Sequence, residues 1–173
     1  MRKAFFAVRF LGAVLAAAAL PIPCAFIDAE RAGAFMSVMG ASSSYSIISL
    51  LPLGRTLCGY SPEAGAAVLS ALSALIFLSV LSVLLSFTYR KGAAAAGFFA
   101  GAAGCTLSCL VLSACLAFLL SGTWQAEVFR GIISPGPGFY FSAAGLFLSA
   151  AGNAGLIFPG GEDKNALTQG LKN

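Results

Sequence analysis

The stretch from residue 93 to residue 120 reads AAAAGFFAGAAGCTLSCLVLSACLAFLL and contains no charged side chain. A hydrocarbon layer about 30 Å thick is crossed by roughly 20 helical residues, so this stretch is long enough to span a membrane. Because the hydrocarbon offers no water to the backbone, the segment is expected to be helical. The sequence therefore predicts an integral membrane protein of the all-α class.

The composition of the whole chain agrees with this class. Of the 173 residues, 59% are hydrophobic and 9% are charged, whereas charged residues make up about a quarter of a soluble domain. A soluble domain of this length could not cover its surface with so few charges. The soluble globular class is therefore excluded.

Three further apolar stretches qualify as membrane-spanning helices, and they cover residues of about 4–20, 64–89 and 138–158. The second stretch follows Ser61, Pro62 and Glu63, which suit a helix cap, a first helical position and the positive end of the helix dipole. The breakers 135–138 and 159–161 bound the last stretch. With the helix at 93–120, we expect a four-transmembrane-helix bundle that forms one membrane domain over residues 1–173.

Two alternatives bear on the number of crossings. The basic start and short apolar run of the first stretch also suit a secretory signal peptide, but Pro21 and Pro23 fit poorly before a cleavage point. We therefore expect the first helix to remain. The uncharged stretch 32–54 is a candidate fifth crossing, but it is rich in Ser and contains Gly40 and Pro52.

The distribution of basic residues decides between four and five crossings. Four crossings leave most of the basic residues in the cytoplasm, as the positive-inside rule requires: Arg2, Lys3, Arg9, Arg90, Lys91, Lys164 and Lys172. Five crossings would remove this bias. We therefore expect both termini inside (N-in/C-in), with a larger first outer loop at 21–62, an outer loop at 121–137 and a cytoplasmic tail at 162–173. The chain is expected to be multi-pass in a plasma (inner) membrane.

The structure of the outer segment 21–62 is left open by its sequence. Residues 45–51 partly alternate between polar and apolar side chains, as a strand or a surface-lying segment would. The segment contains no repeat and no separate soluble domain. We expect it to form a small cap over the helices.

Small residues form the most informative pattern in the helices. They recur at alternating steps of four and three along the last helix, at Gly138, Ser142, Gly145, Ser149 and Gly152. Such a repeat keeps one stripe against a partner helix, and small side chains let two backbones approach closely. Gly97 and Gly101 match the GxxxG crossing motif. These helix-packing faces suit either a tight intramolecular bundle or a face for another protein.

The five cysteines divide into two groups. Cys24 and Cys58 both fall in the outer segment, where a possible disulfide would close a loop of about 35 residues and contribute about 3–4 kcal/mol. The alternative is two free thiols near the membrane interface. The other three lie inside the helix 93–120, where a free Cys usually behaves as a small hydrophobe.

Residues typical of catalysis are missing. The chain has no His, which is the commonest metal ligand and proton shuttle. No Asp, Glu, Lys or Arg lies in the central parts of the last three helices, although such residues mark ion and proton pathways. We expect no enzyme activity, no cofactor, no metal and no nucleic-acid partner. The most polar side chain of the last helix, Asn153, is expected to bond to a neighbouring backbone.

The general plan of four helices with both ends inside and a larger first outer loop is similar to that of claudin-like tetraspan proteins. The Trp-containing signature of the first outer loop in that family is absent, since the only Trp is Trp124. The resemblance therefore covers the architecture and implies no site residue or activity.

These observations lead to three functional hypotheses. The first is a non-enzymatic subunit, scaffold or accessory factor of a membrane assembly, whose partners are the lipid bilayer and another membrane protein or a second copy. The alternative is a small-solute channel or facilitator formed by oligomerisation around Ser- and Gly-lined faces. The third is a membrane thiol-redox protein that uses Cys24 and Cys58.

Overall fold

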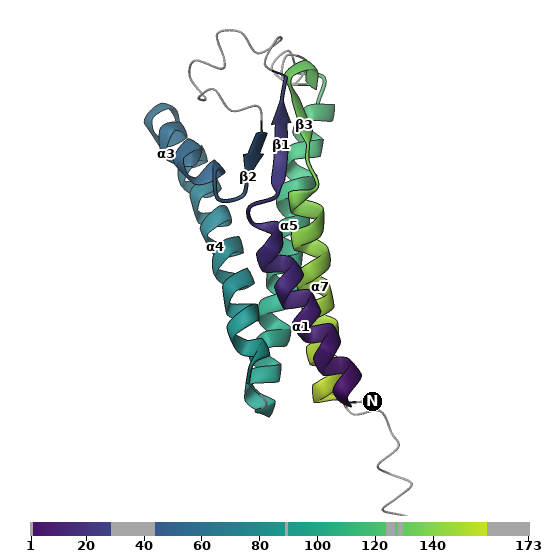
Figure 1. Ribbon diagram of the computed structural model, residues 1–173. Helices are drawn as coiled ribbons and strands as arrows, with labels where there is room; N and C mark the ends of the chain where they lie inside the picture. Colours follow the sequence, from purple (N-terminus) through teal and green to yellow (C-terminus); the bar gives the residue numbers. More distant parts are fainter. Residues whose placement is uncertain (1, 29–43, 89, 124–126, 128–129, 159–173) are drawn as a thin grey trace, which may run out of the picture.

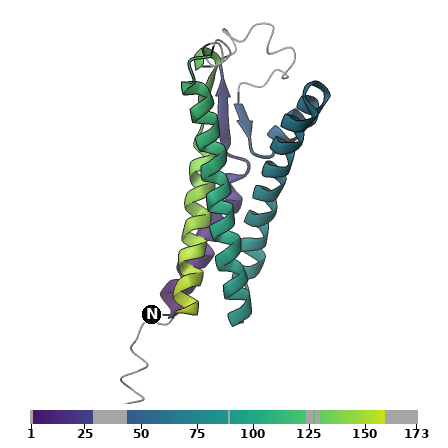
Figure 2. The same ribbon diagram turned by 180° about the vertical axis from the view of Figure 1, so that it is seen from behind.

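The computed structural model describes residues 2–28, 44–88, 90–123, 127 and 130–158. This part of the chain is mostly helical. The longer helices are α1 (Arg2–Ala19), α4 (Pro62–Ser86), α5 (Lys91–Leu120) and α7 (Gly138–Ile157). They lie side by side and alternate in direction along the chain (Figures 1 and 2).

Three of these helices are long and apolar enough to cross a membrane, namely α4, α5 and α7. The expected membrane class is confirmed to that extent. The first helix, α1, has 18 residues and includes Arg2, Lys3 and Arg9. It is not among the three, because these charges interrupt its apolar run.

The predicted helix start at Pro62 is found, with Glu63 in the first turn of α4. The side chain of Ser61 makes no capping hydrogen bond. Instead, the Ser61 carbonyl accepts a hydrogen bond of 2.9 Å from the backbone N–H of Gly65. The first helical hydrogen bond therefore starts at the Ser61 carbonyl. Pro62 occupies the first helical position, where a backbone N–H would have no partner within the helix.

Three short strands correct the expectation of an all-α fold. They are β1 (Pro23–Ile27), β2 (Ser44–Ser46) and β3 (Ile133–Pro135), and they form an antiparallel sheet in the order β2-β1-β3. Phe26 of β1 lies opposite Ser44 on one side and Ser134 on the other. The strands meet because α1 ends where α7 begins, which brings the two outer segments together. Pairing then satisfies backbone groups that no helix covers.

The end of the molecule that carries this sheet is called the sheet end below, and the end with the turn between α4 and α5 is called the turn end (Figure 1). The outer segment 21–62 also contains a helix that the sequence left open, α3 (Leu50–Tyr60). It packs against the first half of α4, where Gly54 faces Leu69 and Gly65 faces Cys58. Trp124, the stretch 29–43 and the predicted tail 162–173 lie outside the described residues.

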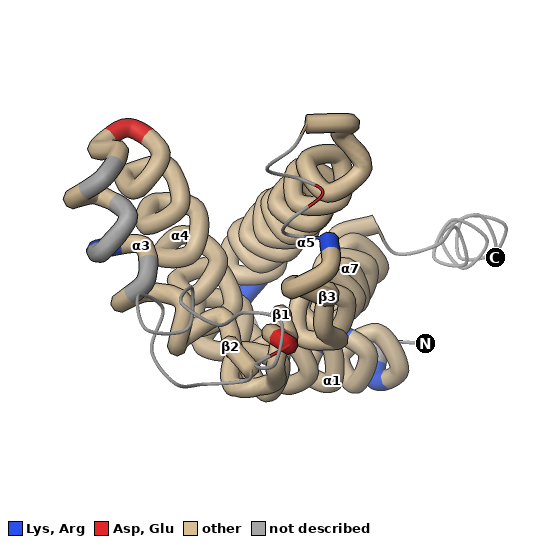
Figure 3. Tube along the Cα trace, turned by 90° about the horizontal axis from the view of Figure 1, so that it is seen from above, with Lys and Arg blue, Asp and Glu red and all other residues tan. Residues whose placement is uncertain are grey.

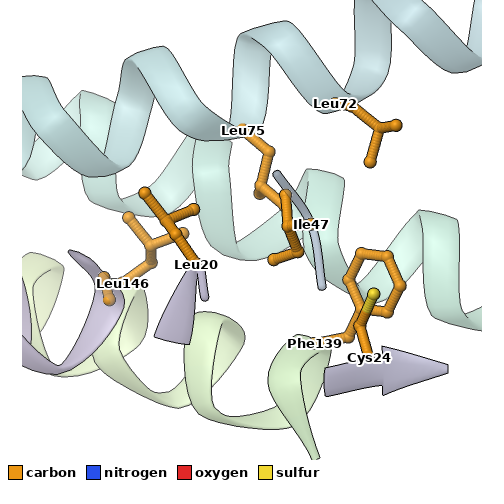
Figure 4. Close-up of a cluster of buried hydrophobic side chains, with 8 residues drawn as sticks. Leu20, Cys24, Ile47, Leu72, Leu75, Phe139 and Leu146 are labelled. Atoms are coloured by element: carbon orange, nitrogen blue, oxygen red, sulfur yellow. The ribbon is translucent and has the colours of Figure 1, made fainter. Parts of the chain in front are cut away.

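The main hydrophobic core lies between the helices toward the sheet end (Figure 4). Its buried members come from α1, the sheet region, α4 and α7, and they are Ala16, Leu20, Cys24, Ile47, Leu72, Leu75, Phe139 and Leu146. Large apolar side chains also cover the outer surfaces of the helices, as expected where lipid replaces water. Examples are Leu11, Phe77, Phe99, Leu110 and Phe147, all more than 60% exposed.

Candidate functional site

The small-residue stripe of α7 is buried, against α1 at Gly145 and Gly152 and against residues 22–24 at Gly138. Gly138, Ser142, Gly145, Ser149 and Gly152 are all buried. A methyl group at Gly145 would lie 2.8 Å from the Cα of Ala16 and 2.8 Å from the carbonyl oxygen of Gly12. At Gly152 it would meet the backbone of Arg9. The stripe therefore brings two backbones into direct contact within one chain.

The other predicted packing face, on α5, lies against a second face of α7. A methyl group at Gly101 would lie 2.8 Å from the carbonyl oxygen of Leu146 and 2.9 Å from the backbone nitrogen of Ala150. At Gly97 it would lie 2.8 Å from Nδ2 of Asn153. Helix α7 thus uses one small face for α1 and another for α5. All seven predicted packing residues are occupied by contacts inside the chain.

Arg9 is a buried cation that joins α1 to the end of α4. Only 1% of the residue is exposed. Its guanidinium donates a hydrogen bond of 3.1 Å from Nη2 to the carbonyl oxygen of Thr88, just beyond the last turn of α4, where the helix dipole favours a positive charge. The same group lies 5.8 Å from the centre of the Phe6 ring, a cation–π distance. These contacts explain how a charge is accommodated deep in the bundle.

Most of the buried polar side chains lie toward the turn end, whereas Ser108 and Ser142 lie at the level of the apolar core. The buried polar residues other than Arg9 come from α4, α5 and α7 and are Ser79, Ser82, Ser86, Ser108, Ser142, Ser149 and Asn153. Five of their polar atoms make no hydrogen bond to the described residues. They are the hydroxyl oxygens of Ser79, Ser82, Ser142 and Ser149 and the amide oxygen Oδ1 of Asn153. Buried polar atoms are normally paired, so these five atoms are chemically distinct from the rest of the core.

The sequence analysis did not predict that Arg9 and these polar side chains are buried. It treated Arg9 as a signal of topology, and it expected Asn153 to bond to a neighbouring backbone. Asn153 does donate to a backbone, but to the Ser149 carbonyl of its own helix, at 2.8 Å. The available signal was the charge of Arg9 inside an apolar run, since a charge within a membrane segment usually faces the bundle interior.

The last third of α5 is exposed around most of its circumference, although Val111 still packs against the apolar core. Residues 113–118 are all exposed over more than one turn. The helix has 30 residues and α7 has 20, so α5 is longer by about 15 Å. Small residues continue here at steps of four, at Cys109, Ser113 and Ala117, and all three are exposed. These residues keep the spacing of Gly97 and Gly101, but a step of four drifts by about 40° around the helix, so they lie on another side of α5 from the face packed against α7.

Cys24 and Cys58 are both free thiols, so the possible disulfide is not formed in this structure. Cys24 is buried in β1 and donates a hydrogen bond of 3.1 Å to the carbonyl oxygen of Tyr45. Burial raises the pKa of the Cys24 thiol to about 11. Cys58 instead faces Gly65 at the contact between α3 and α4. The other cysteines, Cys105, Cys109 and Cys115, are half-buried or exposed on α5.

Charged side chains gather at the two ends of the bundle. The exposed cations Lys3, Arg90 and Lys91 belong to the turn end. The sheet end, seen from above in Figure 3, carries charges of both signs, namely Asp28, Arg55, Glu63, Glu127 and Arg130. Arg130 donates a hydrogen bond of 2.8 Å from Nε to the Leu119 carbonyl at the end of α5.

The described residues contain no group of three or more His, Cys, Asp or Glu side chains placed to hold a metal ion. Comparisons of the chain with protein-family models, with curated proteins and with solved structures found no match.

Proposed function

We propose that this chain is a non-enzymatic, multi-pass membrane protein that acts as a subunit or accessory factor of a membrane assembly. In this proposal α1 is the fourth crossing, both termini lie in the cytoplasm and the sheet end faces outward. The observation that carries the proposal is the exposed last third of α5.

The charges and the packing of α1 support the orientation. Lys3, Arg90 and Lys91 gather at the turn end, as the positive-inside rule requires of a cytoplasmic face. Helix α1 runs along α7 with backbones in contact at Gly145 and Gly152. Its one deep charge, Arg9, is held by the Thr88 carbonyl. In a helix docked in this way, the hydrogen bond to Thr88 and the packing against α7 offset the free-energy cost of placing Arg9 in the bilayer.

The assembly role follows from where small residues lie. In a bilayer, helices associate through close packing, because lipid is as apolar as the helix surface. The ridge at Cys109, Ser113 and Ala117 has the small side chains that such packing uses, and it is exposed. The equivalent positions Gly97 and Gly101 are already packed against α7. Because a spacing of four residues drifts around a helix, Ser113 lies on nearly the opposite side of α5 from Gly97. A partner helix there would form a second interface, separate from the one with α7.

The test is extraction of the tagged protein from its own membrane in mild detergent, followed by mass determination of the intact complex. Ser113→Leu places a large side chain on the ridge, whereas Ser73→Leu makes the same change at an exposed position of α4. We expect a stoichiometric protein partner, or a second copy, that stays bound in wild type and in Ser73→Leu and is lost in Ser113→Leu.

Two results would contradict the proposal. One is a wild-type protein that is a lone monomer at every concentration and detergent ratio. The other is a partner that remains bound equally in both Leu variants, which would place the contact elsewhere on the surface. Circular dichroism of each variant checks that the helices are intact.

The alternative function, a small-solute channel formed by oligomerisation, has weaker support. The path was expected to be lined by serines of α4 and by the stripe of α7, and the α7 serines, Ser142 and Ser149, are fully buried inside the chain. Toward the sheet end, Leu72, Leu75 and Phe139 fill the space between the helices. Solute flux in liposomes that drops in Ser142→Leu and Ser149→Leu would favour this function over the first.

A further inference from the structure

The last third of α5 extends beyond the level at which α7 begins. The two helices are antiparallel, since Gly97 lies against Asn153 and, seven residues further along α5, Gly104 lies against Leu146. The same register carried on to Gly138, the first residue of α7, reaches residue 112 of α5. Residues 113–120 therefore lie beyond α7, over a length of about 12 Å. They are called the tip of α5 below.

Three observations place the tip outside the hydrocarbon layer in the orientation proposed above. A layer of about 30 Å takes roughly 20 helical residues, so a crossing that starts at Lys91, the first residue of α5, ends near residue 111. The level beyond Gly138 also carries the sheet (Figure 1), whose open backbone edges cannot face lipid. Arg130 is exposed and donates to the Leu119 carbonyl within the tip, so the tip ends beside a charge that needs water.

One side of the tip carries a stripe with the spacing of a helix-packing face. The stripe consists of Ser113, Leu116, Ala117 and Leu120, at steps of three, one and three, which keep one side of a helix. All four residues are exposed, Leu120 to 77%. Lipid would cover such a surface at no cost, but water would not. An exposed apolar surface outside the membrane is typical of a protein contact. This set of four residues is called the tip stripe.

We propose that the tip stripe is the contact between two copies of this chain, each stripe packed against the same stripe of the other copy. The inference rests on the proposed assembly function and names its partner. A second copy crosses the membrane in the same direction, so its tip stands at the same height. The stripe is also self-complementary, because the small residues Ser113 and Ala117 leave room for the large side chains of Leu116 and Leu120.

The charges beside the tip suit the same two-fold contact. Glu127 and Arg130 follow α5, have opposite signs and are both exposed. Arg130 lies at the end of the stripe, because it bonds to the Leu119 carbonyl. In a two-fold interface every contact between two different residues occurs twice. A pair between Glu127 of one copy and Arg130 of the other can therefore form on both sides of the axis.

The test is cross-linking between single cysteines in the full-length protein. It is carried out in the native membrane and again in liposomes that contain only the purified protein. Ala117→Cys, with all native cysteines replaced by Ala, places one thiol on the tip stripe. The control keeps only native Cys115, which is also exposed but lies on nearly the opposite side of the helix. A short water-soluble bismaleimide joins neighbouring thiols, and denaturing gels measure the dimer. Ser113→Cys provides a second stripe position if the first variant does not fold.

We expect at least fivefold more cross-linked dimer from Ala117→Cys than from the Cys115 control, in both preparations. The height of the tip is measured separately, in liposomes diluted until dimers are rare. Native Cys109, kept as the only thiol, lies on the same side of α5 as Ala117 but about 12 Å nearer the turn end. A membrane-impermeant maleimide should label Ala117→Cys at least tenfold faster than Cys109.

Four outcomes would overturn the inference. Equal cross-linking of Ala117→Cys and the Cys115 control would indicate random collisions. Equally slow labelling of Ala117→Cys and Cys109 would place the tip inside the lipid. Cross-linking to a protein of another mass in the native membrane, with no dimer in liposomes, would reject the second copy and leave the assembly function standing. No cross-link at either stripe position, with a wild-type protein that is a monomer by mass, would overturn both proposals.

Discussion

Gly97 of α5 lies directly against the side-chain amide of Asn153 of α7. A methyl group at Gly97 would be 2.8 Å from Nδ2 and 2.9 Å from Oδ1. Because Gly has no Cβ, the polar end of Asn153 can occupy the contact between the two helices and still donate to Ser149. The relationship couples the packing of α5 to the orientation of the most polar uncharged side chain in the bundle.

Gly97→Ala should therefore destabilise the fold. The new methyl group forces the Asn153 amide to move and to give up its bond of 2.8 Å to the Ser149 carbonyl. Overpacking of this kind costs about 1–3 kcal/mol. Reversible unfolding in mixed micelles measures the change. Gly92→Ala is the matched control, because a methyl group there meets nothing within 4 Å; it should be neutral or stabilising by up to about 1 kcal/mol. Equal losses in both variants would contradict the packing argument.

Gly145→Ala should weaken the contact between α1 and α7. The new methyl group would meet backbone atoms of Ala16 and Gly12, and a backbone cannot rotate away as a side chain can. We expect the two helices to separate and the free energy of unfolding to fall by about 2 kcal/mol or more. Spin labels at the exposed positions Leu11 and Phe147, in a chain without native Cys, measure the separation.

A matched control for this substitution is Gly59→Ala in α3, where no atom lies within 4 Å of the added methyl group. It should leave the distance between the labels unchanged. If Gly145→Ala also leaves both the distance and the stability unchanged, then α1 and α7 are not in backbone contact at this level.

Arg9→Met should destabilise the junction between α1 and the end of α4. Met keeps an unbranched apolar stem like that of Arg but lacks the guanidinium, so it removes the hydrogen bond of 3.1 Å to the Thr88 carbonyl. That carbonyl lies at a helix end, where no later turn supplies a donor. We expect a loss of about 1–3 kcal/mol in the free energy of unfolding. Stability equal to wild type would show that Thr88 finds another donor.

The Cys24 thiol should be almost inert in the folded protein at neutral pH. Burial raises its pKa from 9.0 to about 11, and the thiolate is the reactive form. In a variant whose only Cys is Cys24, alkylation should therefore rise about tenfold per pH unit up to about pH 11. Fast labelling at pH 7 in folded protein would contradict the buried placement.

The same shift predicts the pH dependence of stability. A raised pKa means that the folded state holds the Cys24 proton more tightly than the unfolded state. Its contribution is fully present below pH 9.0, the ordinary value. It is lost as the pH rises through about 11. Cys24→Ala should therefore lose less free energy of unfolding than wild type between pH 9 and about pH 11. Unfolding of both proteins measured across this pH range gives the difference, and equal losses would contradict it.

Much of the helical organisation was predictable, because the length of an apolar segment and the residues that end a helix are local features of the sequence. Apolar length bounded by Pro, Gly and basic residues located α4, α5 and α7 to within a few residues. The small sheet was not predicted, because its three strands contain three to five residues each and come from segments far apart in the chain. Their pairing depends on where the helix ends meet. The sequence left the helix α3 open for the same reason, since α3 is held by its packing against α4 and has no strong pattern of its own.

The candidate site was predictable in its residues but not in its contacts. The spacing of Gly145 and Gly152 indicates a packing face, yet the same spacing suits contact with a helix of another chain. The structure places this face against α1. It leaves exposed the small residues Ser113 and Ala117, which lie on another side of α5 from Gly97. The buried position of Arg9 likewise depends on the end of α4, which is 79 residues away in sequence.

The sequence by itself determined that this chain is a helical membrane protein, because a hydrocarbon layer admits long apolar segments only as helices that satisfy their own backbone. Only the tertiary structure decided which small faces meet, where the buried cation is held and which part of α5 stays exposed. The physical reason is that close packing between helices in lipid is short-ranged and nearly independent of residue identity beyond size. Such contacts are selected by the lengths and ends of all the helices together.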